Sequence, residues 1–364
     1  MTGIYVHVPF CASKCPYCDF YSLADTTDAD KDAFVAAVLD RFAPYETVTA
    51  DTLYFGGGTP SLLGGKRLAT LIDGARRQFG LQNAEITLEA SPADDLYATV
   101  AAFAAAGGNR VSMGVQAVND RQLHLLGRRH TVAQVDRAVA DVHRAGITNL
   151  SLDLMLGTPE QTETDITHAV RRFADWGATH LSAYLLKLEP NTPFGRTPPA
   201  VPDEDGAAAL YLAACEAAET AGYRQDEISN FAKTGYESRH NRKYWLGEPY
   251  LGFGPAAHSF FEGKRFYYPR SLTDFVNGCA PLAEENDTIE SGTADEYAML
   301  RLRLADGVTE RDFAARFGTS LPDEWRARAA RLPSHLVIAD EHGIRFTREG
   351  FLLSDPLIAH ILWE

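Results

Sequence analysis

Three closely spaced cysteines lie near the start of the chain, in the stretch HVPFCASKCPYCDFYS at residues 7–22. The CxxxCxxC spacing of Cys11, Cys15 and Cys18 allows all three sulfurs to bind one inorganic centre. Structural zinc takes four ligands, commonly from two cysteine pairs, and the sequence has no second pair, although His7 stays open as a fourth ligand. A [4Fe–4S] cluster held by three thiolates would leave one iron open to an outside ligand. We therefore favour an iron–sulfur cluster over zinc or a redox dithiol.

The composition indicates a protein of a reducing compartment. Five cysteines are too few, and odd in number, for a disulfide scaffold of 364 residues, and the isolated Cys215 and Cys279 are interpreted as inert small residues. The net charge of −15 argues against nucleic acid or an anionic membrane as the main partner. The sequence shows neither a signal-peptide pattern nor an apolar run of membrane-spanning length, so we expect a cytoplasmic protein.

Apolar, β-rich runs alternate with alanine-rich helical patterns up to about residue 222. This alternation predicts six β/α units that form a parallel sheet with helical crossovers. The predicted strands cover residues 3–8, 52–55, 85–90, 110–115, 150–156 and 180–188. The predicted helices lie near residues 29–43, 66–79, 95–106, 131–145, 162–177 and 203–221. Because the strands are nearly continuous in apolar residues, we expect the α/β class and a full or partial (β/α) barrel.

The unusual motifs follow the predicted strands directly. The segments after the strands read PFCASKC, GGGTPS, ASP, a single glutamine, GTPEQT and KLEPNTP. In such barrels the loops at the carboxyl ends of the strands carry the chemistry, so these segments should meet at one site. The glycines of GGGTPS, at residues 56–61, would let the backbone approach a ligand closely, and the alternative is a tight structural turn.

Residues 11–18 also show an aromatic residue, Tyr17, directly before the third cysteine, in the pattern CxxxCxΦC. With this motif and GGGTP, the chain resembles the radical S-adenosylmethionine (SAM) superfamily. Over essentially its whole length it resembles the branch that contains oxygen-independent coproporphyrinogen III oxidases and HemW-type haem chaperones. The resemblance implies a partial (β/α)6 TIM-like barrel with a small C-terminal α/β domain. It also implies a [4Fe–4S] cluster whose open iron is bound by the amino and carboxylate groups of SAM.

The resemblance further implies which residues bind SAM. Gly57, Gly58 and Thr59 match the segment that holds the SAM amino group and methionine backbone. A carboxylate or amide at a strand end can bind ribose hydroxyls, and an arginine can neutralise the SAM carboxylate. The other positions that match SAM contacts of the family are Tyr5, Glu89, Gln116, Arg128 and Asp153. For Glu89 and Arg128, the alternative is a salt bridge near the barrel mouth.

Two features favour a haem chaperone over a decarboxylating enzyme. The enzymes of this branch carry a fourth cysteine two residues after the third, where this chain has Phe20. They also have a long extension before the cluster motif, whereas ten residues precede Cys11 here. The enzyme alternative is a coproporphyrinogen III dehydrogenase, which uses an electron donor and a 5′-deoxyadenosyl radical to decarboxylate propionates. Another radical SAM enzyme, such as a methyltransferase, is a third alternative.

The segment HNRKYW at residues 240–245 matches the HNxxYW motif associated with haem binding in HemW-type chaperones. His240 can offer a neutral imidazole nitrogen to haem iron, and Tyr244 lies one helical turn further on. Trp245 offers a flat apolar surface for a porphyrin. The alternative is that these residues pack in the interface between the barrel and the C-terminal part of the chain. His258 is a second, weaker candidate for the haem ligand.

The same segment contains the densest basic cluster of an otherwise acidic chain, formed by Arg239, Arg242 and Lys243. Such a cluster suits the two propionates of haem. The expected partners are therefore haem and a haem-accepting protein, such as a respiratory cytochrome. We hypothesise that the cluster and SAM favour a transfer-competent conformation or a homodimer.

The sequence pattern changes after residue 222, which predicts three parts of the chain. Residues 1–222 are the expected barrel with the cluster and SAM. Residues 223–290 form an aromatic, glycine-rich connecting region with the HNxxYW motif, and residues 291–364 form a small C-terminal domain.

Overall fold

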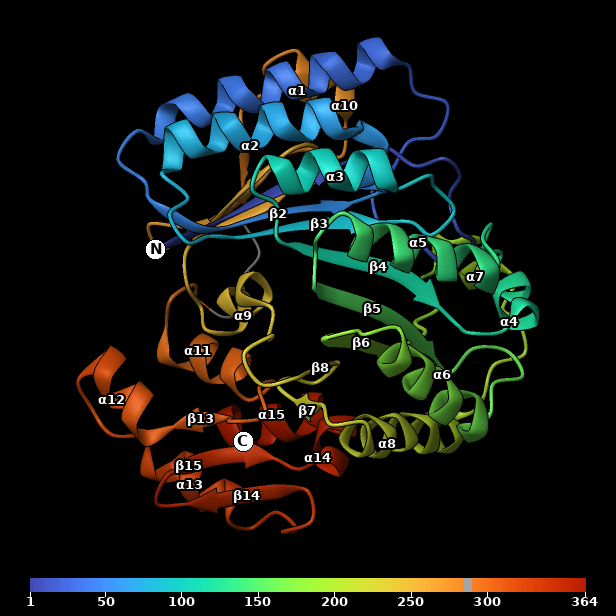
Figure 1. Ribbon diagram of the computed structural model, residues 1–364. Helices are drawn as coiled ribbons and strands as arrows, with labels where there is room; N and C mark the ends of the chain where they lie inside the picture. Colours follow the sequence, from blue (N-terminus) through green and yellow to red (C-terminus); the bar gives the residue numbers. More distant parts are fainter. Residues whose placement is uncertain (285–289) are drawn as a thin grey trace.

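Six parallel strands form the centre of one curved sheet, and connecting helices cover its outer face (Figure 1). The computed structural model describes residues 1–284 and 290–364. The strands pair in chain order, each parallel to the next. They are β1 (Thr2–Val8), β2 (Ala50–Gly57), β3 (Glu85–Ala90), β4 (Arg110–Gln116), β5 (Asn149–Leu156) and β6 (His180–Leu185). The predicted parallel α/β barrel is thus confirmed, and the largest error in a strand end is at β6, which stops before residue 188.

The main helices are α1 (Asp28–Phe42), α2 (Gly65–Phe79), α3 (Tyr97–Ala105), α5 (Val132–Arg144), α6 (Glu163–Asp175) and α8 (Glu204–Thr220). Threonine or aspartate caps the start of α1, α5, α6 and α8, but not of α2 or α3. Thr27, Thr131 and Thr162 each form a reciprocal capping box with the third residue of the helix that follows. Shorter helical turns lie in the loops: η1 (Ala43–Tyr45), η2 (Pro60–Leu63), α4 (Asp120–Leu125) and α7 (Pro193–Arg196).

The two faces of the sheet differ in polarity. On β1, Ile4, Val6 and Val8 are fully buried in the apolar core beneath the helices, whereas Tyr5 and His7 line a cavity inside the barrel. Successive strand side chains point to opposite faces, so the other strands follow the same rule. Their residues that line the inner cavity include Tyr54, Glu89, Arg110, Ser112, Asp153 and Tyr184. Because a parallel sheet usually buries apolar side chains on both faces, this polar inner face indicates a binding surface.

Among the described residues the barrel is open, because the strands at the two edges of the sheet do not pair with each other. At one edge β8 (Asn230–Ala232) pairs antiparallel with β6, and β7 (Arg224–Gln225) pairs with β8. At the other edge β9 (Tyr250–Phe253) pairs parallel with β1. It is followed by β10 (His258–Phe261), β11 (Lys264–Tyr267) and β12 (Leu282–Ala283). Within the described residues the sheet has twelve strands, and the sequence pattern did not predict these edge strands.

Helix α9 (Arg239–Trp245) lies in the opening between the two edges, near the start of β2 (Figure 1). The backbone amides of Arg239 and His240 donate to the two carboxylate oxygens of Glu85, each at 3.1 Å. Since Glu85 is the first residue of β3, α9 covers the end of the barrel opposite to the cysteines. Helix α10 (Leu272–Val276) packs against α1 on the outside.

The chain after residue 290 forms a small α/β unit beside the barrel opening (Figure 1). Its antiparallel sheet has the order β13 (Val308–Thr309), β15 (Gly343–Phe346), β14 (Val337–Asp340). Its helices are α11 (Ala294–Arg301), α12 (Glu310–Phe317), α13 (Asp323–Ala329), α14 (Arg348–Leu352) and α15 (Ser354–Trp363). The division into parts at residues 222 and 290 stays a prediction, and residues 285–289 of the middle part lie outside the described residues. Within the described ranges, no helix combines the length and apolar character needed to cross a membrane.

Candidate functional site

The three cysteines line one cavity of about 210 Å³ at the carboxyl ends of the strands. The Cys11 amide donates to the Leu23 carbonyl, which closes the loop that follows β1. A turn bond of 3.1 Å from the Cys18 amide to the Cys15 carbonyl brings the second and third cysteines together. All three thiols are free and only partly buried. The loop therefore presents three sulfurs to one shared space.

This arrangement fits a cluster better than a single zinc ion. Across residues 1–284 and 290–364, no three His, Cys, Asp or Glu side chains are placed so that they could hold one metal ion. In a [4Fe–4S] cube each thiolate binds its own iron, so the sulfurs need only border a common space. His7, the alternative fourth zinc ligand, points into the barrel. Its ring nitrogens lie 3.1 Å from the Tyr5 hydroxyl and 2.9 Å from the Tyr21 carbonyl.

The GGGTPS loop packs so closely against the cysteine loop that a side chain would not fit. A Cβ atom on Gly58 would lie 2.6 Å from the carbonyl oxygen of Phe10 and 3.1 Å from the sulfur of Cys11. The Thr59 amide donates to the same Phe10 carbonyl at 2.7 Å, and the Thr59 hydroxyl lies 3.5 Å from the Cys11 sulfur. Gly57 has a φ of +113°, which other residues rarely adopt. The glycines thus form a tight turn and also bring backbone next to the cluster position.

Arg128 reaches the cysteine loop from the segment that follows α4. Its Nη1 lies 3.4 Å from the sulfur of Cys15 and 3.2 Å from the hydroxyl of Tyr17, and its Nη2 donates to the Gly114 carbonyl at 2.6 Å. Its Nε is buried and has no hydrogen-bond partner. A guanidinium with an unused donor beside the cysteines fits a carboxylate bound at the open iron.

Glu89 and Asp153 bring two carboxyl groups to the same cavity. Glu89 accepts hydrogen bonds from the Tyr54 hydroxyl at 2.8 Å and from the Gly57 amide at 3.1 Å. The alternative salt bridge between Glu89 and Arg128 therefore does not form. Burial raises the pKa of Glu89, while burial and the nearby Glu89 charge raise the pKa of Asp153 to about 7. Carboxyl groups of this kind suit hydrogen bonds to ligand hydroxyls.

Gln116 ends β4 in a backbone conformation that is unusual for its residue type. Its φ is +73°, and the pairing register of β4 with β5 shifts just before it. Its side-chain oxygen accepts a hydrogen bond of 3.0 Å from the Tyr184 hydroxyl. A non-glycine residue pays for a left-handed conformation, and such residues gather at functional sites.

The predicted SAM contacts divide into two groups. Seven of them line the cluster cavity: Gly57, Gly58, Thr59, Glu89, Gln116, Arg128 and Asp153. Tyr5 instead lies on the inner face of β1 and lines the second cavity described below. All eight SAM contacts stay predictions. Sequence reasoning missed Ser112 and Tyr184, which also line the cluster cavity, although strand alternation in β4 and β6 could have placed them there.

The second cavity, of about 1220 Å³, fills the inside of the open barrel. Cys18, Asp153 and Tyr184 are among the residues that line both cavities, so the two spaces adjoin. Its aromatic lining residues are Tyr5, Tyr17, Phe20, Tyr21, Tyr54, Tyr184, Tyr244, Trp245, Tyr250, Tyr267 and Tyr268. A space of this size with aromatic walls and a few polar groups suits a large, flat ligand.

The HNRKYW segment contributes to this second cavity only in part. Asn241, Tyr244 and Trp245 line the cavity, but His240 does not. The His240 side chain is 1% exposed, with Nδ1 2.8 Å from the Thr52 hydroxyl and Nε2 2.8 Å from the Tyr244 hydroxyl. Burial and the positive charge of Lys243 lower the pKa of His240 to about 3, so its imidazole is neutral. Haem ligation by His240 stays a prediction. It would require one ring nitrogen to break its hydrogen bond and bind the iron instead.

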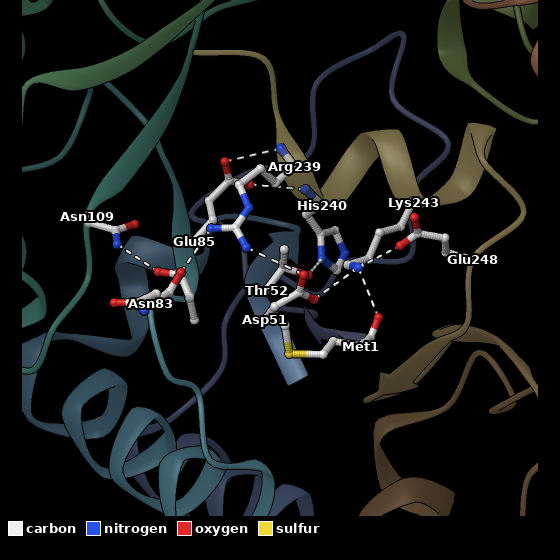
Figure 2. A network of polar contacts seen from close by, with 11 residues as sticks. Met1, Asp51, Thr52, Asn83, Glu85, Asn109, Arg239, His240, Lys243 and Glu248 are labelled. Atoms are coloured by element: carbon white, nitrogen blue, oxygen red, sulfur yellow. Dashed lines mark hydrogen bonds and ion pairs between the residues drawn. The ribbon is translucent and has the colours of Figure 1, made fainter. Parts of the chain in front are cut away.

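The basic residues beside His240 pair with acidic residues of the protein, and Figure 2 shows the contacts of Lys243 and Arg239. Lys243 is 4% exposed, and its ammonium group lies 2.9 Å from Asp51 and 2.8 Å from Glu248. Arg239 lies 3.4 Å from the same Asp51, and Arg242 lies 4.0 Å from Asp226. The interpretation of these residues as a propionate site is therefore wrong for Lys243, because its charge is already paired and shielded from ligands.

His258 lines the mouth of the second cavity from β10. Its side chain is 55% exposed, and its ring stacks on Tyr267 with centroids 5.2 Å apart. Within the described ranges its ionic partner is Glu284, at 3.9 Å. This histidine is accessible but less well held than His240.

Comparisons with known proteins place these features in a family. The sequence profile of the Radical SAM superfamily matches residues 5–173. The chain is 36% identical to the heme chaperone HemW of Escherichia coli, over 87% of this chain and 86% of that protein. It is 34% identical to the heme chaperone HemW of Mycobacterium tuberculosis, over 99% and 94% of the two chains. The identity to the heme chaperone HemW of Bacillus subtilis is 32%, over the whole of both chains.

Among solved structures, the fold resembles that of the coproporphyrinogen III oxidase HemN of Escherichia coli, described as a radical SAM enzyme. The TM-score is 0.81, and the match covers all of this chain and 90% of the other. The sequence identity is 20%, so this likeness concerns the fold alone.

The close approach of the two loops predicts the effect of a single methyl group. In Gly58→Ala, the new Cβ would meet the Phe10 carbonyl and force the cysteine loop away. We expect at least a twofold loss of iron and sulfide per chain after anaerobic reconstitution. Gly64→Ala is the control, because a Cβ there meets nothing within 4 Å, although its φ of +79° costs stability. Equal cluster content in Gly58→Ala and the wild type would contradict the proposed packing.

The buried carboxyl of Glu227 predicts a pH dependence of stability. Glu227 is 2% exposed, and burial together with the neighbouring Asp226 raises its pKa to about 8. The folded state therefore keeps a proton that the unfolded state loses above about pH 4, so this group lowers stability as the pH rises towards 8. We expect Glu227→Gln to raise the unfolding temperature of the ligand-free protein at pH 8.5, and to change it much less at pH 5.

Thermal unfolding at both pH values measures this difference. The exposed Glu216 provides the control variant, Glu216→Gln, which should leave the unfolding temperature unchanged at either pH. An equal effect of Glu227→Gln at pH 5 and at pH 8.5 would show that the carboxyl does not titrate in this range.

Proposed function

The chain belongs to the HemW family of haem chaperones within the radical SAM superfamily, and from this premise we propose that it carries haem inside its barrel and passes it to an acceptor protein. The observation that supports the location most strongly is the inner cavity of about 1220 Å³. Tyr244 and Trp245 of the HNRKYW segment line this cavity, together with many tyrosines. The aromatic walls suit the faces of a porphyrin.

The cluster and SAM would occupy the cluster cavity, which adjoins the inner cavity proposed for haem. Cys11, Cys15 and Cys18 would hold the [4Fe–4S] cluster, and Arg128 would pair with the carboxylate of SAM through its unused Nε. When bound, the pair can supply reductive cleavage of SAM to a radical, provided that an electron donor is present. Asp153 lines both cavities, so SAM in the cluster cavity and haem in the inner cavity would be neighbours.

We propose His240 as the haem ligand, prepared by its two hydrogen bonds. Burial raises the pKa of the Tyr244 hydroxyl, which stays protonated and, in the His240 tautomer that we propose, donates a hydrogen bond to Nε2. The other nitrogen, Nδ1, then carries the proton and donates to the Thr52 hydroxyl. Metal-binding histidines commonly donate their second N–H in this way, which fixes the ring and its tautomer. Since Tyr244 lines the cavity, its movement would open Nε2 to the iron.

The enzymatic alternative also has a structural observation in its favour. The cluster cavity and the inner cavity share the residues Glu89, Ser112, Asp153 and Tyr184, so a substrate in the barrel would lie next to the SAM position. Against decarboxylation of coproporphyrinogen III stands Phe20, which occupies the place of the fourth cysteine and is 68% exposed at the mouth of both cavities. We therefore favour the chaperone. We also propose a cytoplasmic location and transfer from a homodimer to a respiratory cytochrome.

The hydrogen bond between Tyr244 and His240 yields opposite predictions for two variants. His240→Ala should lose haem binding at least tenfold and keep its iron and sulfide content, because the cluster lies at the other end of the barrel. Tyr244→Phe should bind haem about 2- to 10-fold more tightly, because iron no longer competes with a hydroxyl for Nε2. Both affinities follow from titration of the Soret absorbance.

His258→Ala is the matched control, since this histidine also lines the inner cavity. We expect it to bind haem as the wild type does. If His258→Ala abolishes binding while His240→Ala preserves it, the ligand assignment fails. Turnover of coproporphyrinogen III by the reconstituted wild type with SAM and a reductant would overturn the choice of a chaperone.

A further inference from the structure

Arg110 is a buried arginine that no carboxylate in the described part of the chain pairs with. It is the first residue of β4, its side chain is 1% exposed, and it lines the inner cavity. Its Nε and Nη1 atoms are buried and have no hydrogen-bond partner, and within residues 1–284 and 290–364 no ion pair involves it. An isolated buried charge costs several kcal/mol, and buried arginines are normally paired.

Other buried arginines of the chain show what Arg110 lacks. Arg301, which is 4% exposed, forms an ion pair of 3.1 Å with Asp312 and donates to the Gly307 carbonyl at 3.0 Å. Arg265 is partly buried and lies 2.6 Å from Glu296. Arg128 also keeps a buried Nε without a partner, but its other nitrogens contact the cysteine loop and the Gly114 carbonyl. Among the described residues no ion pair involves Arg110, so its buried charge calls for an explanation in terms of the cavity that it lines.

The acidic groups of the barrel do not supply the missing partner. Burial raises the pKa of Asp153 and of Asp226 to about 7, and these shifts are reduced by the positive charge of Arg110. Neither carboxylate lies within ion-pair distance of the Arg110 guanidinium, although both come near enough to sense it. Groups with such pKa values are partly protonated at neutral pH and neutralise Arg110 incompletely.

Neighbouring polar atoms share the lack of partners. The hydroxyl of Thr87, whose backbone is the register partner of Arg110 on β3, is buried without a hydrogen bond. Nε2 of His180 on β6 is in the same state, while its Nδ1 lies 2.7 Å from the Ser151 hydroxyl. The charge of Arg110 lowers the pKa of His180, as does burial, so the two side chains lie near each other. Strand alternation places these three side chains on the inner face of β3, β4 and β6, and of the three Arg110 lines the cavity.

We propose that Arg110 binds a carboxylate of the ligand in the inner cavity, and that for haem this carboxylate is a propionate. The assignment rests on the proposed haem function and adds the group that recognises the acidic edge of the porphyrin. A guanidinium binds a carboxylate through two parallel hydrogen bonds. The Nε and Nη1 of Arg110 lie on different edges of the guanidinium, and both are donors without a partner, so either edge keeps a free N–H for a carboxylate oxygen.

The position of Arg110 agrees with iron ligation by His240. The charge of Arg110 is one of the causes that lower the pKa of His240, after burial and Lys243, so both side chains act at the same end of the barrel. A porphyrin ligated from α9 would therefore present its propionate edge within the reach of the inner wall of β4. Lys243, the residue favoured for this role by sequence, is already paired with Asp51 and Glu248.

The test compares ligands that differ only in their carboxylates. Metal-free protoporphyrin IX and its dimethyl ester are titrated into the cluster-reconstituted protein by fluorescence quenching, so that iron ligation plays no part. The wild type should bind the free acid about 10- to 100-fold more tightly than the ester, as expected for a charge-assisted hydrogen bond in a buried site. Arg110→Gln should lose this preference through weaker binding of the acid, with little change for the ester.

A second measurement separates binding from folding. Arg110→Met should leave the unfolding temperature of the ligand-free protein unchanged or higher, because it removes an unpaired buried charge. Arg301→Met is the matched control and should lower that temperature, because it leaves Asp312 without its partner. If Arg110→Met lowers the temperature as much as Arg301→Met does, the guanidinium serves the fold and the proposal fails.

The outcomes distinguish this inference from the proposed function. If Arg110→Gln keeps the preference for the free acid, or if the wild type shows none, the carboxylate assignment is overturned while haem binding through His240 stands. If His240→Ala abolishes haem binding but leaves protoporphyrin IX binding intact, both assignments are supported. A wild type that binds neither porphyrins nor haem would overturn both.

Discussion

The carboxylate of Glu85 holds together two segments that lie about 150 residues apart, and the inner cavity depends on this contact. It accepts the backbone amides of Arg239 and His240, each at 3.1 Å, and so fixes the beginning of α9 to the beginning of β3. A negative charge at this position also complements the positive end of the helix dipole. With α9 held there, Tyr244 and Trp245 face the inside of the barrel.

Burying polar side chains on the inner face of the sheet lowers the free energy of unfolding. The apolar core on the outer face offsets this loss. The core beneath the helices is built from fully buried apolar side chains such as Ile4, Val6, Leu53 and Phe55. This layer stabilises the barrel through burial of apolar surface, at about 25 cal/mol per Å². It offsets the cost of keeping buried polar and charged residues such as Arg110 and Asp153 on the inner face. The same sheet thus separates stability on one face from binding on the other.

The sequence was sufficient for the order of elements and for the grouping of the strand-end motifs. Parallel strands place their carboxyl ends at one edge, so Cys11, Gly58 and Asp153 had to come together. Contacts between residues that lie far apart in the sequence could not be predicted. Nothing in the sequence near HNRKYW indicates that Asp51 and Glu85 are its acidic partners. For this reason Lys243 was assigned to a ligand although its charge is paired within the protein. Arg110 was overlooked because the lack of a partner has no signature in a sequence.

The short edge strands of the open barrel bear on how the sheet avoids pairing with other chains. An unclosed sheet exposes backbone amides and carbonyls that can pair with another chain, which is a route to aggregation. The outermost strands here, β7 (Arg224–Gln225) and β12 (Leu282–Ala283), are only two residues long. They offer a neighbouring molecule too little backbone to add a strand. A partner that approaches the opening must therefore recognise side chains, which makes the contact selective and easy to reverse.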